Sequence, residues 1–157
     1  MAFIVSPIQD LGCPTVLLNK GIRTDLTIVA GNPTNPTIAG NSVTFTASQG
    51  EFDTTDQSIK FAICGVSNLS FFYTGLIETN NSGYDVLEIK VTGIDVNFLY
   101  QRESVEGTPE GYESVTGSPD IDLDNDDPCG YLVEISFNTG DSLYNDGVFY
   151  NVSFSVS

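Results

Sequence analysis

The stretch VFYNVSFSV, residues 148–156, decides the fold class of this 157-residue chain. Every second side chain in it is large and apolar: Val148, Tyr150, Val152, Phe154 and Val156. The side chains between them are polar except for the first: Phe149, Asn151, Ser153 and Ser155. Because successive side chains of a strand point to opposite faces, this alternation predicts a β-strand with one buried face.

The same period of two recurs along the chain. Clear cases are VTFTA (43–47), SIKFAI (58–63), DVLEIKV (85–91) and YLVEISF (131–137). Weaker candidates are FIVSPI (3–8), IRTDLTIV (22–29), LSFFYTGLI (69–77) and IDVNFLY (94–100). Turn-forming segments such as GNPTNP (31–36), NNSG (80–83) and NDG (145–147) separate them. We therefore expect about nine short strands, and no window shows helical spacing.

Short strands joined by polar turns predict an all-β fold, an antiparallel β-sandwich. We favour a jelly-roll-like sandwich over an immunoglobulin-like one, because the chain exceeds the roughly 100 residues of an immunoglobulin domain. The length suits one domain, residues 1–157. Residues 1–40 hold four prolines and are expected to be partly an extended N-terminal arm.

The chain is strongly acidic, with five basic residues against 21 acidic ones and a net charge of -16. Such a field repels nucleic acid and anionic lipid, and it favours cations and basic protein surfaces. The acidity is concentrated between residues 103 and 127, which hold nine carboxylates and no Lys or Arg. Because carboxylates of this density cannot lie in a core, we expect residues 101–130 to form a long acidic surface loop.

Four carboxylates in this segment stand at every second position: Asp120, Asp122, Asp124 and Asp126. This spacing resembles the first half of a calcium loop, but an EF-hand also needs a bidentate Glu at its twelfth position, where Tyr131 stands. Two interpretations stay open. One is a calcium site in a loop between strands, with these four aspartates as ligands. The other, which the general behaviour of charge runs favours, is a solvated or partner-facing acidic surface.

Catalytic groups are scarce. The chain has no His, which rules out a Ser-His-Asp or Cys-His arrangement. Glu88 and Glu134 are expected to be exposed strand residues and not a glycosidase pair, because strands alternate buried and exposed positions. No nucleotide-binding glycine motif occurs. We therefore predict that the chain is not an enzyme and requires no cofactor.

The three cysteines, Cys13, Cys64 and Cys129, are widely separated. An odd number of scattered cysteines fits reduced thiols, although one disulfide among the three stays open. Without His they make a poor zinc site. The N-terminal residues lack the basic and long apolar segments of a secretory signal, so we expect synthesis in the cytoplasm.

Aromatic residues are the candidate contact residues. Phe71, Phe72 and Tyr73 form a cluster that indicates either a strand with both faces covered or an exposed anchor for a partner. Phe149 falls on the polar face of the C-terminal strand and is the sharper interface candidate.

These observations favour a non-enzymatic structural protein that acts through protein contacts or self-assembly. We expect a virion component, such as a capsid decoration, head-fibre or tail-associated domain on the virion surface, because jelly rolls are common in capsids. The alternative is a calcium-assisted carbohydrate-binding or adhesion module. Neither nucleic acid binding nor membrane insertion is expected.

Overall fold

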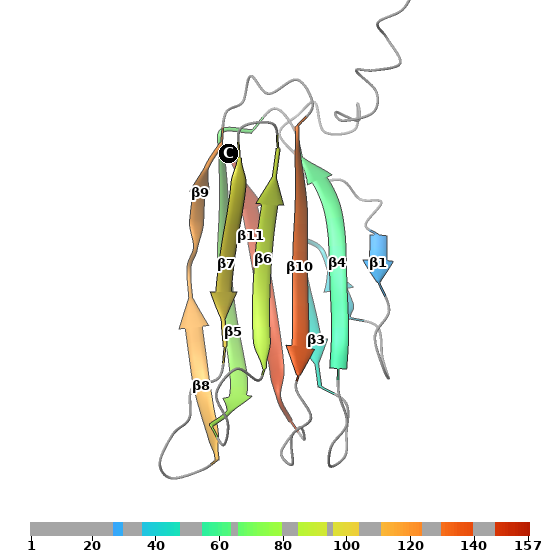
Figure 1. Cartoon of the computed structure of the whole chain (residues 1–157), viewed down its shortest axis with the longest axis vertical. Helices are drawn as coiled ribbons and strands as arrows, with labels where there is room; N and C mark the ends of the chain where they lie inside the picture. The colour runs from blue at the N-terminus through green and yellow to red at the C-terminus, as the bar shows by residue number, and fades with distance from the viewer. Residues whose placement is uncertain are drawn as a thin grey trace, which may run out of the picture.

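The computed structural model describes residues 27–29, 36–47, 55–63, 66–79, 85–93, 96–103, 111–123, 130–139 and 147–157. Within these residues all regular elements are β-strands, arranged in two antiparallel sheets (Figure 1). Among them there is no helix long and apolar enough to cross a membrane. The predicted all-β sandwich is confirmed.

Sheet A has five strands, in the order β1 (Thr27–Val29), β4 (Thr55–Ile63), β10 (Tyr131–Thr139), β6 (Val86–Thr92) and β7 (Asn97–Arg102). Sheet B has six strands. Its order is β2 (Thr37–Ala39), β3 (Ser42–Thr46), β11 (Phe149–Val156), β5 (Asn68–Glu78) and β8 (Tyr112–Gly117), and β9 (Asp120–Asp122) also pairs with β5.

The strand order is that of a jelly roll. The innermost hairpin joins β6 to β7, and successive outer pairs are β5 with β8, β4 with β10, and β3 with β11. These nested pairs alternate between the two sheets, so the chain folds as one long hairpin rolled into a sandwich. Figure 1 shows β6 and β10 of sheet A in front of β5 and β11 of sheet B. The preference for a jelly roll over an immunoglobulin-like order agrees with this topology.

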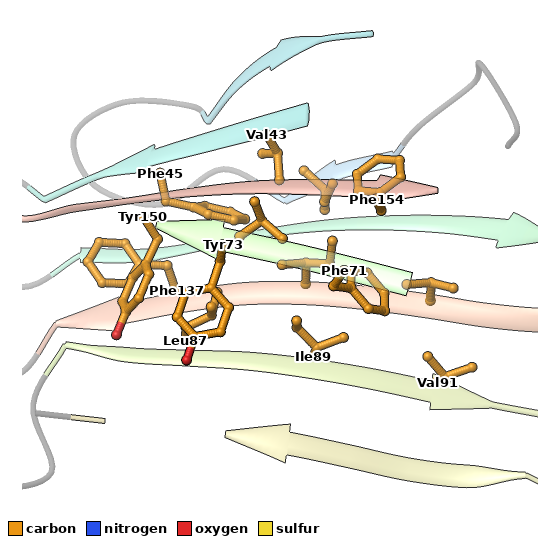
Figure 2. Close-up of a cluster of buried hydrophobic side chains, with 14 of the residues drawn as sticks. Val43, Phe45, Phe71, Tyr73, Leu87, Ile89, Val91, Phe137, Tyr150 and Phe154 are labelled. Atoms are coloured by element: carbon orange, nitrogen blue, oxygen red, sulfur yellow. The ribbon is translucent and has the colours of Figure 1, made fainter. Parts of the chain in front are cut away.

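The core lies between the sheets and is made of the apolar half of each alternating strand. Ile59, Ile135 and Ile89 form one row across sheet A and are fully buried. Aromatic rings join the sheets. Phe61 stacks on Phe154 with ring centroids 4.9 Å apart. Phe137 lies edge-on to Tyr150 with centroids 5.4 Å apart (Figure 2). Each such side chain contributes about 1.5–3 kcal/mol through burial, so the alternation supplies most of the stabilising free energy.

Two expected irregular segments contain strands. Residues 101–130, expected to form a long acidic loop, include β8 and β9. Val115, Ile121 and Leu123 in this segment are buried and anchor it to the sandwich. Its described carboxylates are exposed: Glu103, Glu113, Asp120 and Asp122. Residues 1–40, expected to be partly an extended arm, include the short edge strands β1 and β2. The candidate strand FIVSPI lies outside the described residues.

Candidate binding face

The outward side of sheet B carries no charged side chain across β2, β3, β11, β8 and residues 68–76 of β5. The side chains of this outward side are those that alternate with the core-facing side chains along each strand. We call it the neutral face: Thr37, Ala39, Ser42, Thr44, Thr46, Asn68, Ser70, Phe72, Thr74, Leu76, Tyr112, Ser114, Thr116, Phe149, Asn151, Ser153 and Ser155.

The strand register aligns the polar groups of the neutral face into ladders. One ladder crosses all five paired strands, in the order Thr37, Thr44, Asn151, Thr74 and Thr116. Asn151 is held within it, because its Nδ2 donates to Thr44 Oγ1 at 2.7 Å. Hydroxyl and amide groups on a sheet are therefore presented in fixed positions and can both donate and accept hydrogen bonds.

A shallow pocket of about 160 Å³ lies on the neutral face between β5 and β11. Its lining residues are Ser70, Phe71, Phe72, Ser153, Phe154 and Ser155. Phe71 and Phe154 are buried with their side chains in the core, whereas the Phe72 side chain is 51% exposed. The pocket therefore offers one aromatic ring and three hydroxyl groups to a ligand.

Asp120 lies at one end of the neutral face, paired with Ser70. The Ser70 hydroxyl donates to Asp120 Oδ1, and Asn68 Nδ2 donates to Asp120 Oδ2 at 3.1 Å. Both hydrogen bonds lower the pKa of the Asp120 carboxyl, and the one from Ser70 has the larger effect. The carboxylate is therefore ionised and fixed in orientation beside the pocket.

The predicted metal ligands are only partly placed. Asp120 and Asp122 project from the same side of β9 and are exposed, while Asp124 and Asp126 lie outside the described residues. Among the described residues no group of three or more His, Cys, Asp or Glu side chains could share a metal ion. Cys13, Cys64 and Cys129 also lie outside the described residues.

The predicted interface residues separate into two groups. Phe71 and Tyr73 are 2% and 1% exposed, so they belong to the core and are not available as contact residues. Phe72 points outward and Phe149 is partly exposed on the same face. The expectation that both faces of this strand are covered is therefore wrong at Phe72, because no described residue of the chain packs over the ring from outside.

Sequence reasoning missed the polar ladders of the neutral face. The alternation already placed Asn151 and Ser153 outward, but their neighbours come from strands far away in the sequence. Asn151 and Thr44 are 107 residues apart, for example. Only the register of the folded sheet shows that these side chains meet.

The outward side of sheet A has a different character. Lys60 of β4 forms an ion pair with Glu134 of β10 at 3.4 Å, and Glu88 forms an ion pair with Lys90 on the same strand, β6. Two exposed leucines, Leu99 and Leu132, accompany these charges. As predicted, Glu88 and Glu134 are outward strand residues. Among the described residues, the lysines Lys60 and Lys90 are thus on the face opposite the pocket.

No protein-family model matches the chain, and no curated protein matches it in sequence. Similarity is found among solved structures. The K2 adhesin domain of Lys-gingipain is 10% identical with a TM-score of 0.50, and the match covers 85% of this chain and 89% of that one. A carbohydrate-binding module, TmCBM61 in complex with β-1,4-galactotriose, is 13% identical with a TM-score of 0.44, covering 94% of each chain.

A third similar structure is the enzymatically active domain of tailspike protein 4 of bacteriophage CBA120. It is 10% identical with a TM-score of 0.44, and the match covers 85% of this chain and 20% of that one. Identities this low concern the fold alone, and a shared fold does not determine function.

Proposed function

We propose that this chain is a non-catalytic binding domain that contacts neutral carbohydrate through the neutral face. One observation carries the proposal: in a chain with net charge -16, the described outward side of sheet B is uncharged across the neutral face, and Asp120 and Asp122 of β9 stand only at its end. In place of charges this face presents ordered hydroxyl and amide groups beside an exposed aromatic ring. Binding sites commonly combine an apolar or aromatic surface with a few placed polar groups, and sugars offer both kinds of surface to them.

The alternative of hydrolysis has little support among the described residues. A glycosidase needs one carboxyl that stays protonated to act as an acid. The pKa of Asp120 is lowered, and Asp85, whose pKa is raised, is fully buried away from solvent. The proposal is therefore binding without turnover, with no cofactor required for the contact itself.

The proposal rests on the residues of the face and not on the similar structures. Carbohydrate-binding modules and an adhesin domain have related folds, which makes carbohydrate the first ligand class to test. The pocket is much smaller than the roughly 300–1,000 Å³ of sites for drug-sized ligands. The pocket could hold a single sugar ring of an oligosaccharide that lies across the sheet.

The test is a screen of neutral oligosaccharides followed by calorimetric titration of the best ligand. Phe72→Ala is expected to weaken binding by about two- to tenfold, since loss of one aromatic contact costs about 0.5–1.5 kcal/mol. Leu132→Ala, a similarly exposed side chain on the opposite face, is the matched control and should leave affinity unchanged. Equal effects of the two substitutions, or no binding of any neutral glycan, would exclude the neutral face as a sugar site.

A second candidate is the virion component that the composition suggests. The observation in its favour is the pair of exposed leucines, Leu99 and Leu132, beside the ion pairs of sheet A, since apolar residues among charges suit a protein contact. Sedimentation of the whole chain over a range of concentrations tests it. A component that assembles with itself should form larger species that Leu99→Lys abolishes, whereas a strict monomer argues against self-assembly.

A further inference from the structure

The pocket on the neutral face has a charged group at its edge and, among the described residues, no cation beside it. Ser70 lines the pocket and donates a hydrogen bond to Asp120, so the carboxylate adjoins the space that a ligand ring would occupy. Lys60, Lys90 and Arg102 are the basic residues of the described part of the chain, and none of them belongs to the neutral face. Within the described part of the chain, no basic side chain therefore balances the negative charge of Asp120 at the site.

The orientation of this carboxylate is set by the sheet. Asp120 of β9 lies opposite Ser70 of β5. Asn68, two residues before Ser70 on the same strand, donates a hydrogen bond to the second carboxylate oxygen of Asp120, Oδ2. The Ser70 hydroxyl also lies 2.8 Å from Asn68 Oδ1, so the three side chains form one network. Each carboxylate oxygen can accept more than one hydrogen bond, and both remain exposed to a ligand.

These features point to selection among sugars by charge. We propose that Asp120 makes the Phe72 pocket selective for neutral sugars, by accepting hydrogen bonds from ligand hydroxyls and repelling carboxylate or sulfate groups near the bound ring. This inference rests on the proposed function and assigns it a ligand class. Hydrogen bonds to a charged acceptor are stronger than neutral ones, whereas two like charges at close range repel.

The test compares a neutral oligosaccharide that binds with its counterpart in which one sugar is a uronic acid. The wild-type protein is expected to bind the neutral ligand at least about tenfold more tightly, a difference of about 1.4 kcal/mol. Asp120→Asn keeps an acceptor oxygen and the shape of the side chain but removes the charge. It should weaken binding of the neutral ligand and reduce the preference for it over the acidic one by about tenfold.

Asp56→Asn is the matched control, because it removes one charge from an exposed position on β4, in the opposite sheet. It should leave the preference unchanged, which separates the local charge of Asp120 from the net charge of the chain. Circular dichroism and a melting curve show whether each variant is folded. Ser70→Ala provides a second variant that frees the carboxylate without removing its charge, and it should retain the preference while lowering affinity.

The outcomes distinguish the two proposals. If neutral glycans bind and Phe72→Ala weakens them, but Asp120→Asn preserves the discrimination, the inference about Asp120 is wrong and the proposed function stands. If no neutral glycan binds, the proposed function fails and the selectivity fails with it. A protein that prefers the acidic ligand also overturns the inference.

Discussion

Asp85 is a buried carboxyl that ties one sheet to the other. It directly precedes β6 of sheet A, and its Oδ2 accepts a hydrogen bond from the backbone N–H of Glu78 in sheet B at 2.8 Å. Its φ angle of 53° is in the left-handed region, which Asp and Asn tolerate better than most residues. Its Oδ1 has no hydrogen-bond partner among the described residues. Ionisation of Asp85 in the folded protein therefore costs free energy, because the buried charge is only partly solvated by hydrogen bonds.

Burial raises the pKa of Asp85 to about 7, and the nearby Glu78 adds to this, while the Glu78 N–H acts in the opposite direction. Because the pKa is raised on folding, the folded state binds this proton more tightly than the unfolded state. The stabilising contribution is complete below the ordinary pKa near 4 and is lost as the pH rises through about 7.

Asp85→Asn should remove this dependence, because Asn stays neutral and can still accept the hydrogen bond from Glu78. The variant should match the wild type near pH 4 and exceed its free energy of unfolding by a few kcal/mol at pH 8, since each pKa unit is about 1.4 kcal/mol. Urea unfolding at intervals between these pH values measures it. Asp56→Asn, at an exposed site, should run parallel to the wild type, and parallel curves for Asp85→Asn would contradict the prediction.

At the scale of elements, β8 packs so closely on the core that it needs a glycine. A Cβ atom at Gly117 would lie 2.4 Å from the ring of Tyr73, which is paired with it in sheet B. The Tyr73 hydroxyl in turn bonds to the Tyr100 hydroxyl of sheet A at 2.7 Å. Burial, with the Tyr100 contact, keeps the pKa of Tyr73 well above its usual value, so this hydroxyl stays protonated and able to join the sheets.

Gly117→Ala is therefore expected to displace the Tyr73 ring and break the link to Tyr100. Overpacking of this kind typically costs about 1–3 kcal/mol of unfolding free energy, which chemical denaturation would measure. Thr116→Ala, on the exposed side of the same strand, should change stability by under about 0.5 kcal/mol. If the two variants were equally stable, the close approach of β8 to Tyr73 would not be a constraint on the fold.

The strands of the acidic segment, β8 and β9, could not be predicted from its composition. In β8 and β9 the outward positions are almost all polar or acidic, and the buried ones are as few as Val115 and Ile121. Each is a short strand that pairs with the long β5, which supplies the hydrogen-bonding partner for both. A strand of three to six residues shows too few alternating positions to be recognised from the sequence, even when it pairs with a long strand elsewhere in the chain.

At the scale of the whole molecule, charge is distributed unequally between the two outer faces. Sheet A carries the ion pairs of Lys60 and Lys90, and the neutral face of sheet B has none. The net charge of -16 is therefore carried elsewhere, and part of it is on the segment around β9. Such a charge disfavours the compact state through self-repulsion.

Added salt should consequently stabilise the chain. Between about 0.01 and 0.15 M NaCl the screening length falls from roughly 30 to 8 Å, and the melting temperature should rise by a few degrees. Because Asp120 and Asp122 are exposed and Asp120 already accepts hydrogen bonds, CaCl₂ and MgCl₂ at equal ionic strength should act alike. A melting temperature that rises with calcium alone, and falls again with a chelator, would instead place a calcium site on the chain.

The sequence by itself determined the fold class, most of the strands and which side chains fill the core. Alternation is a local property, so Ile135, Phe154 and their neighbours could be assigned to the buried face without knowing any partner strand. The same alternation could also have assigned Phe72 to the exposed face and Phe71 and Tyr73 to the buried one. Only the tertiary structure decided that Asn151 lies beside Thr44, that Ser70 holds Asp120, and that Asp85 reaches Glu78. These contacts join segments up to 107 residues apart, and their register is set by the packing of two sheets on a shared core.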